Sequence, residues 1–327
     1  MVASGNGAKG LIVGMRVLRR GGSALDAVEA ATRVVEDDER DHSVGAGGLP
    51  NVLGEVELDA SIMDGRTRRA GGVGALRGYR NPITIARAVM ERLPHVLLAG
   101  DGAARFAREI GAETAELLTD EARELWRKRL RRARVTPETV AKRKRLARIV
   151  WSTTVVERGT VNFIAVDREG NLASAVSTSG WAYKYPGRVG DSPIVGAGNY
   201  CDSRYGAATC SGFGELAMRA LTARITVEHL RDGASAEEAA RAAIAETNAL
   251  EARYGRTRAG GGSEAHADAR VSQGYRRYPS ARINVVVLAP DGTYASATTR
   301  RGARYAVLTA KMARPLLLPR TLVLGRR

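Results

Sequence analysis

The stretch "VVERGTVNFIAVDREGNLASAVSTSG", residues 155–180, marks a change of pattern almost halfway along the 327-residue chain. Its segments "VNFIAVD", "REGN" and "LASAVSTSG" predict a hairpin of two buried strands joined by a turn. Thr160 stands directly after Gly159 and directly before the first strand. A threonine in this position is either a strand residue, where its branched side chain is favoured, or a nucleophile. The rest of the sequence has to decide between the two.

Helical periodicity and strand alternation are both present on either side of this hairpin. The predicted elements are, in order, two helices within 10–39, a strand in 54–65, two helices within 81–111, the hairpin after Thr160, a Gly-rich loop region at 186–215, a helix over 215–253 and a second hairpin at 283–300. Ser23 is the predicted cap of the second helix. Helices and strands in this order predict an α+β fold built in layers.

The composition indicates a globular protein with a core of small aliphatic residues. Apolar residues make up 44% and aromatic residues 5%, and 327 residues are enough to bury roughly three quarters of the unfolded surface. Basic residues number 51 against 35 acidic ones, and eleven of them lie between Arg127 and Arg148 with Glu138 as the single acid. Such a run predicts a solvated linker over about 112–150. Base-stacking aromatics are nearly absent from it, Trp126 apart, which argues against a nucleic-acid partner.

Several classes of site lack support in the sequence. Cys201 and Cys210 form no CxxC pair or metal spacing, and no secretory leader precedes them. The chain is therefore expected to be cytoplasmic with free thiols, although a disulfide between the two stays open. The four histidines lie far apart, so neither a zinc site nor a histidine triad is predicted. No apolar run approaches the roughly 18 residues that span a membrane.

Thr160 could supply its own catalytic base. A threonine at a chain N-terminus carries an α-amine whose ordinary pKa near 8 lets it accept the hydroxyl proton around neutral pH. The condition is cleavage of the bond between Gly159 and Thr160, and glycine permits the backbone geometry that self-cleavage would need. No metal or other cofactor is required for this chemistry.

Motifs in both halves of the chain resemble those of the N-terminal-nucleophile asparaginase family, which includes glycosylasparaginases and plant-type L-asparaginase/isoaspartyl peptidases. The second half carries "STSG" (177–180), "PGRVGDSPIVGAGNY" (186–200) and "SGFGE" (211–215). The first half carries "GGSALDAVEA" (21–30), "VGAGG" (44–48), "GEVELDASIMDG" (54–65), "NPITIARAVME" (81–91) and "HVLLAGDGA" (95–103). The resemblance covers residues of about 10 to 110 and 157 to 230.

The resemblance implies catalytic roles for four residues. Thr160 would be the nucleophile, and Thr178 in "STSG" would hydrogen-bond to it and tune it. Ser211 and Gly212 would form the oxyanion hole that stabilises the tetrahedral intermediate. Ser211 stands where the family usually has threonine, so a hydroxyl is retained.

Two further residues would bind the substrate. Arg188 and Asp191 in "GRVGD" would hold the α-carboxylate and the α-ammonium of an aspartyl unit, since a forked cation matches one charge and a carboxylate the other. Taken singly, these residues also fit structural roles, as a loop ion pair for example. The shared order of the motifs favours the catalytic interpretation.

The resemblance also implies an architecture. The fold would be the four-layer αββα sandwich of N-terminal-nucleophile hydrolases. Self-cleavage would give an α subunit, 1–159, that ends with the basic linker, and a β subunit, 160–327, that begins with Thr160. The two would form one αββα domain, and the cleaved units would pair as a homodimer.

The expected activity is hydrolysis of the side-chain amide of an asparaginyl or β-aspartyl substrate. The resemblance implies N4-(β-N-acetylglucosaminyl)-L-asparaginase or L-asparaginase activity. An isoaspartyl dipeptidase without sugar specificity is the alternative, because the N-terminal "VASGNGAKG" lacks the tryptophan that glycosylasparaginases place against their substrate. A third possibility, from another class, is a basic nucleic-acid-binding protein on an inactive hydrolase scaffold.

Overall fold

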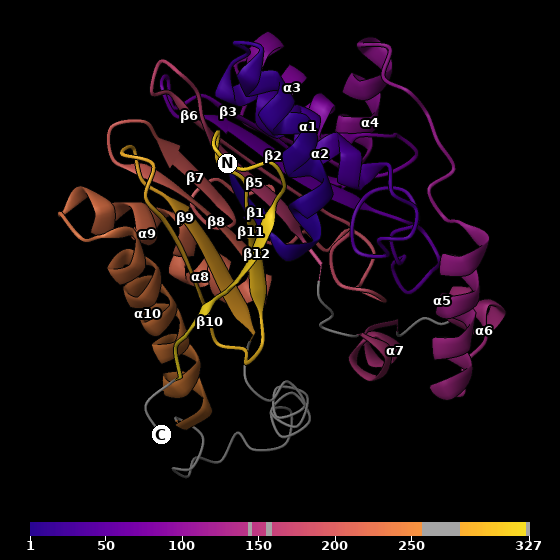
Figure 1. Ribbon diagram of the computed structural model, residues 1–327. Coiled ribbons are helices and arrows are strands. Elements are labelled where there is room, and N and C mark those ends of the chain that lie inside the picture. The colour runs from indigo at the N-terminus through magenta and orange to yellow at the C-terminus, as the bar shows by residue number, and fades with distance from the viewer. Residues whose placement is uncertain (143–145, 155–158, 257–281, 325–327) are drawn as a thin grey trace.

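The computed structural model describes residues 1–142, 146–154, 159–256 and 282–324 of the chain. It contains two β-sheets, of eight and five strands, with helices on the outer side of each (Figure 1). The larger sheet has the strand order β12-β11-β1-β5-β6-β2-β3-β4, and the smaller one β13-β10-β9-β8-β7. The predicted α+β class is confirmed.

The eight-stranded sheet has the predicted hairpin at its centre. Its strands are β1 (Val2–Ser4), β2 (Leu58–Asp64), β3 (Ala70–Leu76), β4 (Leu97–Ala99), β5 (Val161–Val166), β6 (Leu172–Thr178), β11 (Arg304–Val307) and β12 (Leu316–Pro319). Strands β5 and β6 pair antiparallel, with Val161 opposite Ser177. Strand β1, which the sequence pattern did not predict, fills the gap between β5 and β11.

The five-stranded sheet faces the larger one. Its strands are β7 (Asn199–Asp202), β8 (Gly206–Gly212), β9 (Ile283–Leu288), β10 (Tyr294–Thr298) and β13 (Thr321–Leu322). One buried cluster joins the two sheets, with Ile164 and Leu172 from the first and Val286 and Leu288 from the second. Burial of these side chains between the sheets is a main source of stability for the pair.

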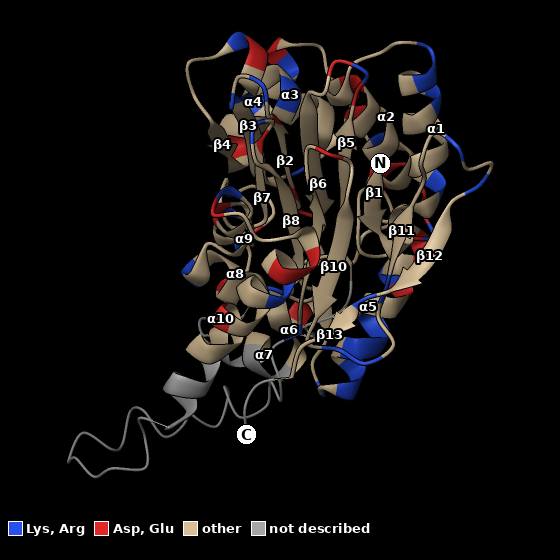
Figure 2. Cartoon of the chain, turned by 60° about the vertical axis from the view of Figure 1, so that its left-hand side comes forward, with Lys and Arg blue, Asp and Glu red and all other residues tan. Residues whose placement is uncertain are grey.

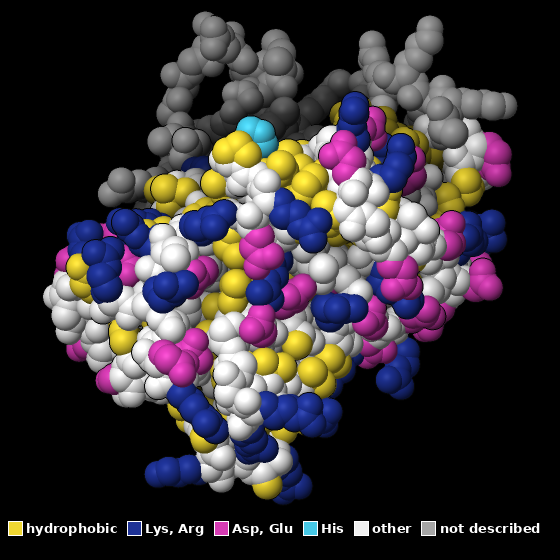
Figure 3. Space-filling view, turned by 90° about the horizontal axis from the view of Figure 1, so that it is seen from above, with side chains coloured by type: hydrophobic (Ala, Val, Ile, Leu, Met, Phe, Trp, Pro, Cys, Tyr) yellow, Lys and Arg dark blue, Asp and Glu magenta, His cyan; other side chains and the backbone are white. Residues whose placement is uncertain are grey.

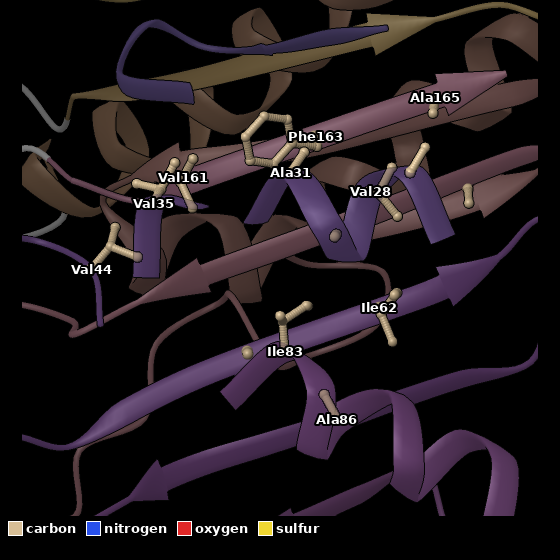
Figure 4. Packing of buried hydrophobic residues seen from close by; sticks show 14 of the residues in the cluster. Val28, Ala31, Val35, Val44, Ile62, Ile83, Ala86, Val161, Phe163 and Ala165 are labelled. Carbon is tan, nitrogen blue, oxygen red and sulfur yellow. The ribbon is translucent and has the colours of Figure 1, made fainter. Parts of the chain in front are cut away.

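Most helices bury their apolar faces on the outer sides of the sheets, whereas α5 (Asp120–Arg132), α6 (Pro137–Lys142) and α7 (Leu146–Thr153) pack in a separate cluster beside them. The others are η1 (Gly5–Gly7), α1 (Ala8–Arg19), α2 (Ala24–Glu36), α3 (Pro82–Arg92), α4 (Gly100–Glu109), α8 (Gly214–Ala220), α9 (Thr222–Arg231) and α10 (Ala236–Arg256). Ser23 caps α2 as predicted, since its hydroxyl accepts the Asp26 N–H at 3.1 Å. Figure 4 shows Ala31 and Val35 of α2 over Val161 and Phe163 of β5.

The basic segment is helical and partly buried, which corrects its interpretation as a solvated linker. Helices α5 and α6 and most of α7 lie within it, and Trp126, Leu130, Val135 and Val140 are buried in a cluster that also contains Val52 and Tyr183. The Trp126 indole N–H donates to the Val52 carbonyl at 3.4 Å. Figure 2 shows the ribbon of α5 coloured largely blue, for Lys and Arg, at one end of the molecule. The net charge of the segment correctly indicated that one face of these helices is solvated, but it gave no sign of their buried apolar face.

The described residues contain no membrane-spanning helix, no group of metal ligands and no disulfide. No helix among them is long and apolar enough to cross a membrane, and no group of three potential metal ligands occurs in the described ranges. Cys201 and Cys210 are buried and free. Figure 3 shows cationic and anionic side chains interspersed over the face seen from above, so that face carries no large patch of a single sign.

Candidate active site

A small pocket opens where strand β5 begins, strand β6 ends and the Gly-rich loop starts. Thr160 immediately precedes β5 and is 9% exposed. The residues that line the pocket are Gly159, Thr160, Thr178, Gly180, Trp181, Arg188, Gly190, Asp191, Ser192 and Gly212. Five of the residues predicted from the sequence, Thr160, Thr178, Arg188, Asp191 and Gly212, therefore share one cavity, together with the predicted junction residue Gly159.

The peptide bond between Gly159 and Thr160 is contacted by Thr178 on one side and by Ser43 on the other. The Thr178 hydroxyl donates to the Gly159 carbonyl oxygen at 2.8 Å, and it accepts the Gly180 N–H at 3.0 Å. Ser43 packs against the other side, because a Cβ placed on Gly159 would lie 1.6 Å from the Ser43 Cβ. Only glycine fits at this position, since real Cβ contacts never come that close.

Arg188 is fixed by an aromatic ring and a carboxylate. Its Nε and Nη2 atoms donate to Glu215 Oε1 at 3.0 and 2.8 Å, and Nη2 also reaches Oε2 at 2.9 Å. The guanidinium carbon lies 4.3 Å from the centre of the Trp181 ring, close enough for a cation–π contact. Glu215 takes the Nε side of the fork, which leaves Nη1 for a ligand. An added Cβ on pocket residue Gly190 would lie 2.8 Å from that Nη1 atom.

Asp191 is a buried carboxylate with an unused acceptor. Its Oδ2 atom is buried, and no hydrogen bond from the described residues reaches it. Burial raises the pKa of Asp191 to about 6, while the charge of Arg188 acts in the opposite direction. A buried acceptor without a partner is costly, so Oδ2 is suited to receive a donor from a ligand. An ammonium group would supply such a donor.

Strand β8 brings Ser211 and Gly212 to the edge of the pocket. Gly212 has φ +116°, and a Cβ there would lie 2.0 Å from the Arg282 carbonyl oxygen, so this position requires glycine. Ser211 is not among the lining residues, and its hydroxyl accepts the Asn284 side-chain N–H at 3.2 Å. The predicted pair is therefore adjacent to the pocket, with Gly212 in its wall and Ser211 beside it.

Sequence reasoning missed the residues that support this wall. Ser43 and Glu215 contact Gly159 and Arg188 from segments distant along the chain. Glu215 was within the quoted "SGFGE" motif, so its position carried a signal. Trp181 directly follows "STSG", and nothing in its neighbouring residues indicated that it would stack on Arg188.

Comparison with known proteins identifies the family of the chain. Residues 8–261 match the family described as Asparaginase. The chain is 42% identical over 229 residues to "N(4)-(Beta-N-acetylglucosaminyl)-L-asparaginase" of Elizabethkingia miricola, which is 70% of this chain and 63% of that protein. It is 43% identical over 236 residues to "Isoaspartyl peptidase/L-asparaginase" of Bos taurus, 71% of each chain. It is 42% identical over 234 residues to "Plant-type L-asparaginase" of Pyrococcus horikoshii, 72% of this chain and 75% of that protein.

The chain belongs to the asparaginase family. The resemblance drawn from its motifs is thereby confirmed. The family and the names of these relatives indicate a hydrolase that acts on amides. The match to the Elizabethkingia miricola protein spans less than two thirds of that protein's length, 63%. The relatives' names divide between glycosylasparaginase and isoaspartyl peptidase/L-asparaginase at similar identity, so the family alone does not choose the leaving group.

Proposed function

We propose that the chain is a self-cleaving threonine-nucleophile amidohydrolase that removes the amine from the side-chain amide of an aspartyl unit. The observation that carries the proposal is the shared pocket of Thr160, Arg188 and Asp191, with Gly159 as the residue before the nucleophile. The proposed substrates are N4-(β-N-acetylglucosaminyl)-L-asparagine and L-asparagine. A β-aspartyl dipeptide is the alternative, and all three share the aspartyl head.

Self-cleavage would begin with attack of the Thr160 hydroxyl oxygen on the Gly159 carbonyl carbon. Negative charge develops on the carbonyl oxygen, which accepts the hydrogen bond from Thr178 at 2.8 Å. A donor aimed at that oxygen stabilises the tetrahedral intermediate. Collapse breaks the C–N bond, moves the acyl group to the hydroxyl oxygen and frees the Thr160 amine. Water then hydrolyses this ester and leaves a carboxylate on Gly159.

In turnover, the Thr160 hydroxyl oxygen would again be the nucleophile, and the newly freed α-amine of Thr160 would be the base. The free α-amine of Thr160 takes the hydroxyl proton as the oxygen attacks the side-chain carbonyl of the substrate. The proton passes to the leaving amine, and water hydrolyses the acyl-enzyme to release aspartate. Gly212 and Ser211 at the end of β8 are the proposed oxyanion hole. No cofactor is needed, because the nucleophile carries its own base.

The substrate head would be matched by two charges of opposite sign. Arg188 offers Nη1 to the α-carboxylate, because Glu215 occupies the other side of its fork. Asp191 offers the buried Oδ2 to the α-ammonium. The two residues are three positions apart in one loop, and both line the pocket. A β-aspartyl unit with a free amine and carboxylate is the chemical class that satisfies both.

The proposal includes the larger organisation implied by the family. The two sheets and their outer helices are interpreted as the αββα sandwich, with the α subunit ending at Gly159 and the β subunit beginning at Thr160. Pairing of two cleaved units as a homodimer is also proposed. Size-exclusion chromatography with light scattering would measure that state directly.

The experiment that tests the function combines processing with turnover. Denaturing electrophoresis of the purified protein should resolve two fragments of similar size, and N-terminal sequencing of the second should begin TVNFIAVD. The cleaved protein is then assayed on the three substrates side by side, with Thr160→Ala as the inactive control. An intact chain with full activity would overturn the mechanism. An uncleaved, inactive chain whose binding to RNA falls steeply with salt would favour the inactive-scaffold alternative.

A further inference from the structure

Three polar side chains alternate along one face of the strand that crosses behind the substrate loop. Glu57 lies just before β2, and Asp59 and Ser61 lie within it. All three are buried. Their apolar neighbours Leu58 and Ala60 are also buried, but successive side chains of a strand point to opposite faces. Glu57, Asp59 and Ser61 therefore share the face that meets the loop 187–192.

Each of the three contacts the backbone of that loop. Glu57 Oε1 accepts the Gly187 N–H at 2.9 Å, and Asp59 Oδ2 accepts the Gly190 N–H at 3.2 Å. The Ser61 hydroxyl donates to the Ser192 carbonyl oxygen at 2.5 Å. Along the chain, the anchored residues 187 and 190 flank Arg188, and the anchored residues 190 and 192 flank Asp191. A row of side chains at the two-residue spacing of a strand thus holds the backbone on both sides of each proposed substrate-binding residue.

A local irregularity of the sheet directs Asp59 toward this task. The register of β2 with β3 shifts between Leu58 and Ala60, because β3 has an extra residue there and Gly74 and Ala75 both stand opposite Asp59. Its second oxygen, Oδ1, accepts the Ala75 N–H at 2.8 Å, and Ala75 has φ +49°, a conformation unusual for alanine. Bulges of this kind commonly redirect a side chain next to an active site. Both oxygens of Asp59 accept backbone N–H groups, Oδ1 from Ala75 of β3 and Oδ2 from Gly190 of the substrate loop.

The same residue is tied to the strand that carries Thr178. Asp59 is the register partner of Thr178 in the antiparallel pairing of β2 with β6. One residue therefore connects the strand that supports the scissile carbonyl with the loop that carries Arg188 and Asp191. A displacement of Asp59 would therefore move the substrate loop, and it would also reach Thr178 through the pairing of β2 with β6.

A buried lysine balances the charges in this region. Lys184 Nζ donates to the Glu57 carbonyl oxygen at 3.1 Å and lies 3.8 Å from Glu57 Oε2. Burial lowers the pKa of Lys184, and the charges of Asp59 and Glu57 oppose that shift. Buried carboxylates are stable only when paired or hydrogen-bonded. Lys184 supplies the counter-charge, so the carboxylates can serve as acceptors for the loop.

We infer that Glu57, Asp59 and Ser61 form a frame that positions Arg188 and Asp191 for the aspartyl head of the substrate. The inference rests on the proposed function of those two residues. The frame residues are positioning residues, because they act through the loop backbone and line no part of the pocket. The frame fixes the spacing between the guanidinium and the carboxylate, and that spacing must match the separation of the two charged groups on the substrate.

Two substitutions and one matched control test the frame in the self-cleaved protein. Asp59→Asn keeps one acceptor oxygen but turns a donor toward the second backbone N–H, so it breaks at least one of the two bonds. Ser61→Ala removes the bond to Ser192. Ser296→Ala is the control, because Ser296 is also buried and its hydroxyl also donates to a backbone carbonyl, that of Val285 at 2.6 Å. It lies in β10 of the other sheet.

The readout is the Kd for L-aspartate by calorimetry, with KM and kcat for L-asparagine and the Tm of each variant. Loss of one such bond should weaken L-aspartate binding about tenfold and raise KM more than it lowers kcat. The control should show a comparable fall in Tm without a change in Kd. If both frame variants fold and bind L-aspartate within twofold of the unsubstituted protein, the frame is refuted. If Asp59→Asn does not fold, Ser61→Ala decides.

Failure of the proposed function would look different. An unsubstituted, cleaved protein that neither binds L-aspartate nor hydrolyses any β-aspartyl amide would refute the function before the frame variants are compared. A protein that binds and hydrolyses normally, but whose affinity does not depend on Asp59 or Ser61, would refute the frame alone.

Discussion

The Thr178 hydroxyl lies 2.8 Å from the carbonyl oxygen of Gly159, a residue nineteen positions earlier in the chain. The bond joins the end of β6 to Gly159, two positions before β5 begins, and the pairing of the two strands brings them together. Since Thr178 also accepts the Gly180 N–H, its proton is directed toward a carbonyl oxygen. The group expected to tune the nucleophile thus contacts the bond that must be cleaved to create it.

Removal of this hydroxyl should slow self-cleavage. Thr178→Val keeps the shape of the side chain but has no donor for the Gly159 oxygen. We expect cleavage to slow by about 10²- to 10³-fold, the usual effect of losing one oxyanion donor. Thr178→Ser retains the hydroxyl and is the matched control. Fragment formation followed over time by denaturing electrophoresis measures both rates, and equal rates for valine and serine would contradict the role.

Substitution of Gly159 by alanine should block cleavage for a steric reason. The new Cβ would lie 1.6 Å from the Cβ of Ser43, so one of the two segments must move. Ser43 also accepts the Ser179 N–H through its carbonyl, at 2.8 Å, and movement would disturb the end of β6. We expect Gly159→Ala to remain a single chain of 327 residues.

The matched control for this test is Gly170→Ala. Gly170 also has a positive φ, +79°, but a Cβ there would meet no atom within 4 Å. That variant should cleave at a rate close to normal, although its stability should fall somewhat because of the backbone conformation. Complete processing of Gly159→Ala would show that the contact with Ser43 is not maintained in the reacting chain.

Arg188 and Asp191 should be required for turnover but not for cleavage. Each matches one charge of the aspartyl head, and loss of a partner should cost about 2–5 kcal/mol in transition-state binding. Arg188→Lys should recover little, because a lysine cannot make a bidentate contact with Glu215 and still present a second donor pair. The peptide bond at Gly159 has no α-carboxylate, so processing should persist in Arg188→Lys and Asp191→Asn. Near-normal asparagine hydrolysis by either variant would show that Arg188 and Asp191 only stabilise the loop and do not bind the substrate.

The pH dependence of activity should have an acid limb set by Asp191. Burial raises the pKa of this carboxyl to about 6, and only its ionised form attracts an ammonium group. Protonation of Asp191 should therefore add a steeper fall in kcat/KM for L-asparagine below about pH 6 to the decline caused by protonation of the Thr160 α-amine near its ordinary pKa of about 8. Asp191→Asn should lose this limb from whatever activity remains. An unchanged limb in that variant would assign it to another group.

A second pH effect concerns stability, through Glu36. Burial raises the pKa of this carboxyl to about 8, while Ser177 and the Ile83 N–H donate to Oε1 and favour its charged form. The native state then keeps a proton that the unfolded state loses above its ordinary pKa of 4.5. The contribution of Glu36 is fully present below pH 4.5 and declines as the pH rises toward 8. Denaturant titrations should show that this decline is absent from Glu36→Gln.

The parts of the fold that the sequence predicted are those determined by local pattern. Alternation gave the hairpin of β5 and β6, and the order of motifs gave the five predicted residues that share the pocket with Gly159. Contacts that depend on tertiary packing could not be recognised from the sequence pattern. Asp59 appeared only as one charged position in an alternating strand, and its meeting with Gly190 depends on how the loop folds back over β2. Strand β1 is three residues long, too short for a period to emerge.

The basic segment shows how a correct observation led to a wrong interpretation. Its charge is real, but Trp126 and Leu130 are four positions apart and so share one helix face. Thr119 caps α5 by accepting the Ala122 N–H at 3.3 Å, a signal available in the sequence. A count of charges describes the helix as a whole and does not distinguish its two faces. The helical spacing of its few apolar residues would have identified the buried face.

The apolar face of α5 should therefore be needed, and its basic face dispensable. Leu130 is fully buried against the cluster that includes Trp126, Val52 and Tyr183, and the Tyr183 hydroxyl donates to the Leu125 carbonyl at 3.1 Å. Leu130→Ala should destabilise this packing by about 2–5 kcal/mol. Since Tyr183 lies two positions after the pocket residue Trp181, the loss should also raise KM a few fold.

Arg127→Ala, an exposed change on the same helix, is the matched control and should alter stability by no more than about 0.5 kcal/mol. Hydrogen exchange of the α5 amides reports the effect directly, because amides exchange fast once the helix opens locally. Protection should collapse over 120–132 in Leu130→Ala and stay unchanged in Arg127→Ala. If the two variants exchange alike and retain the same KM, the helix packs too weakly to influence the pocket, and the whole segment is then dispensable for turnover.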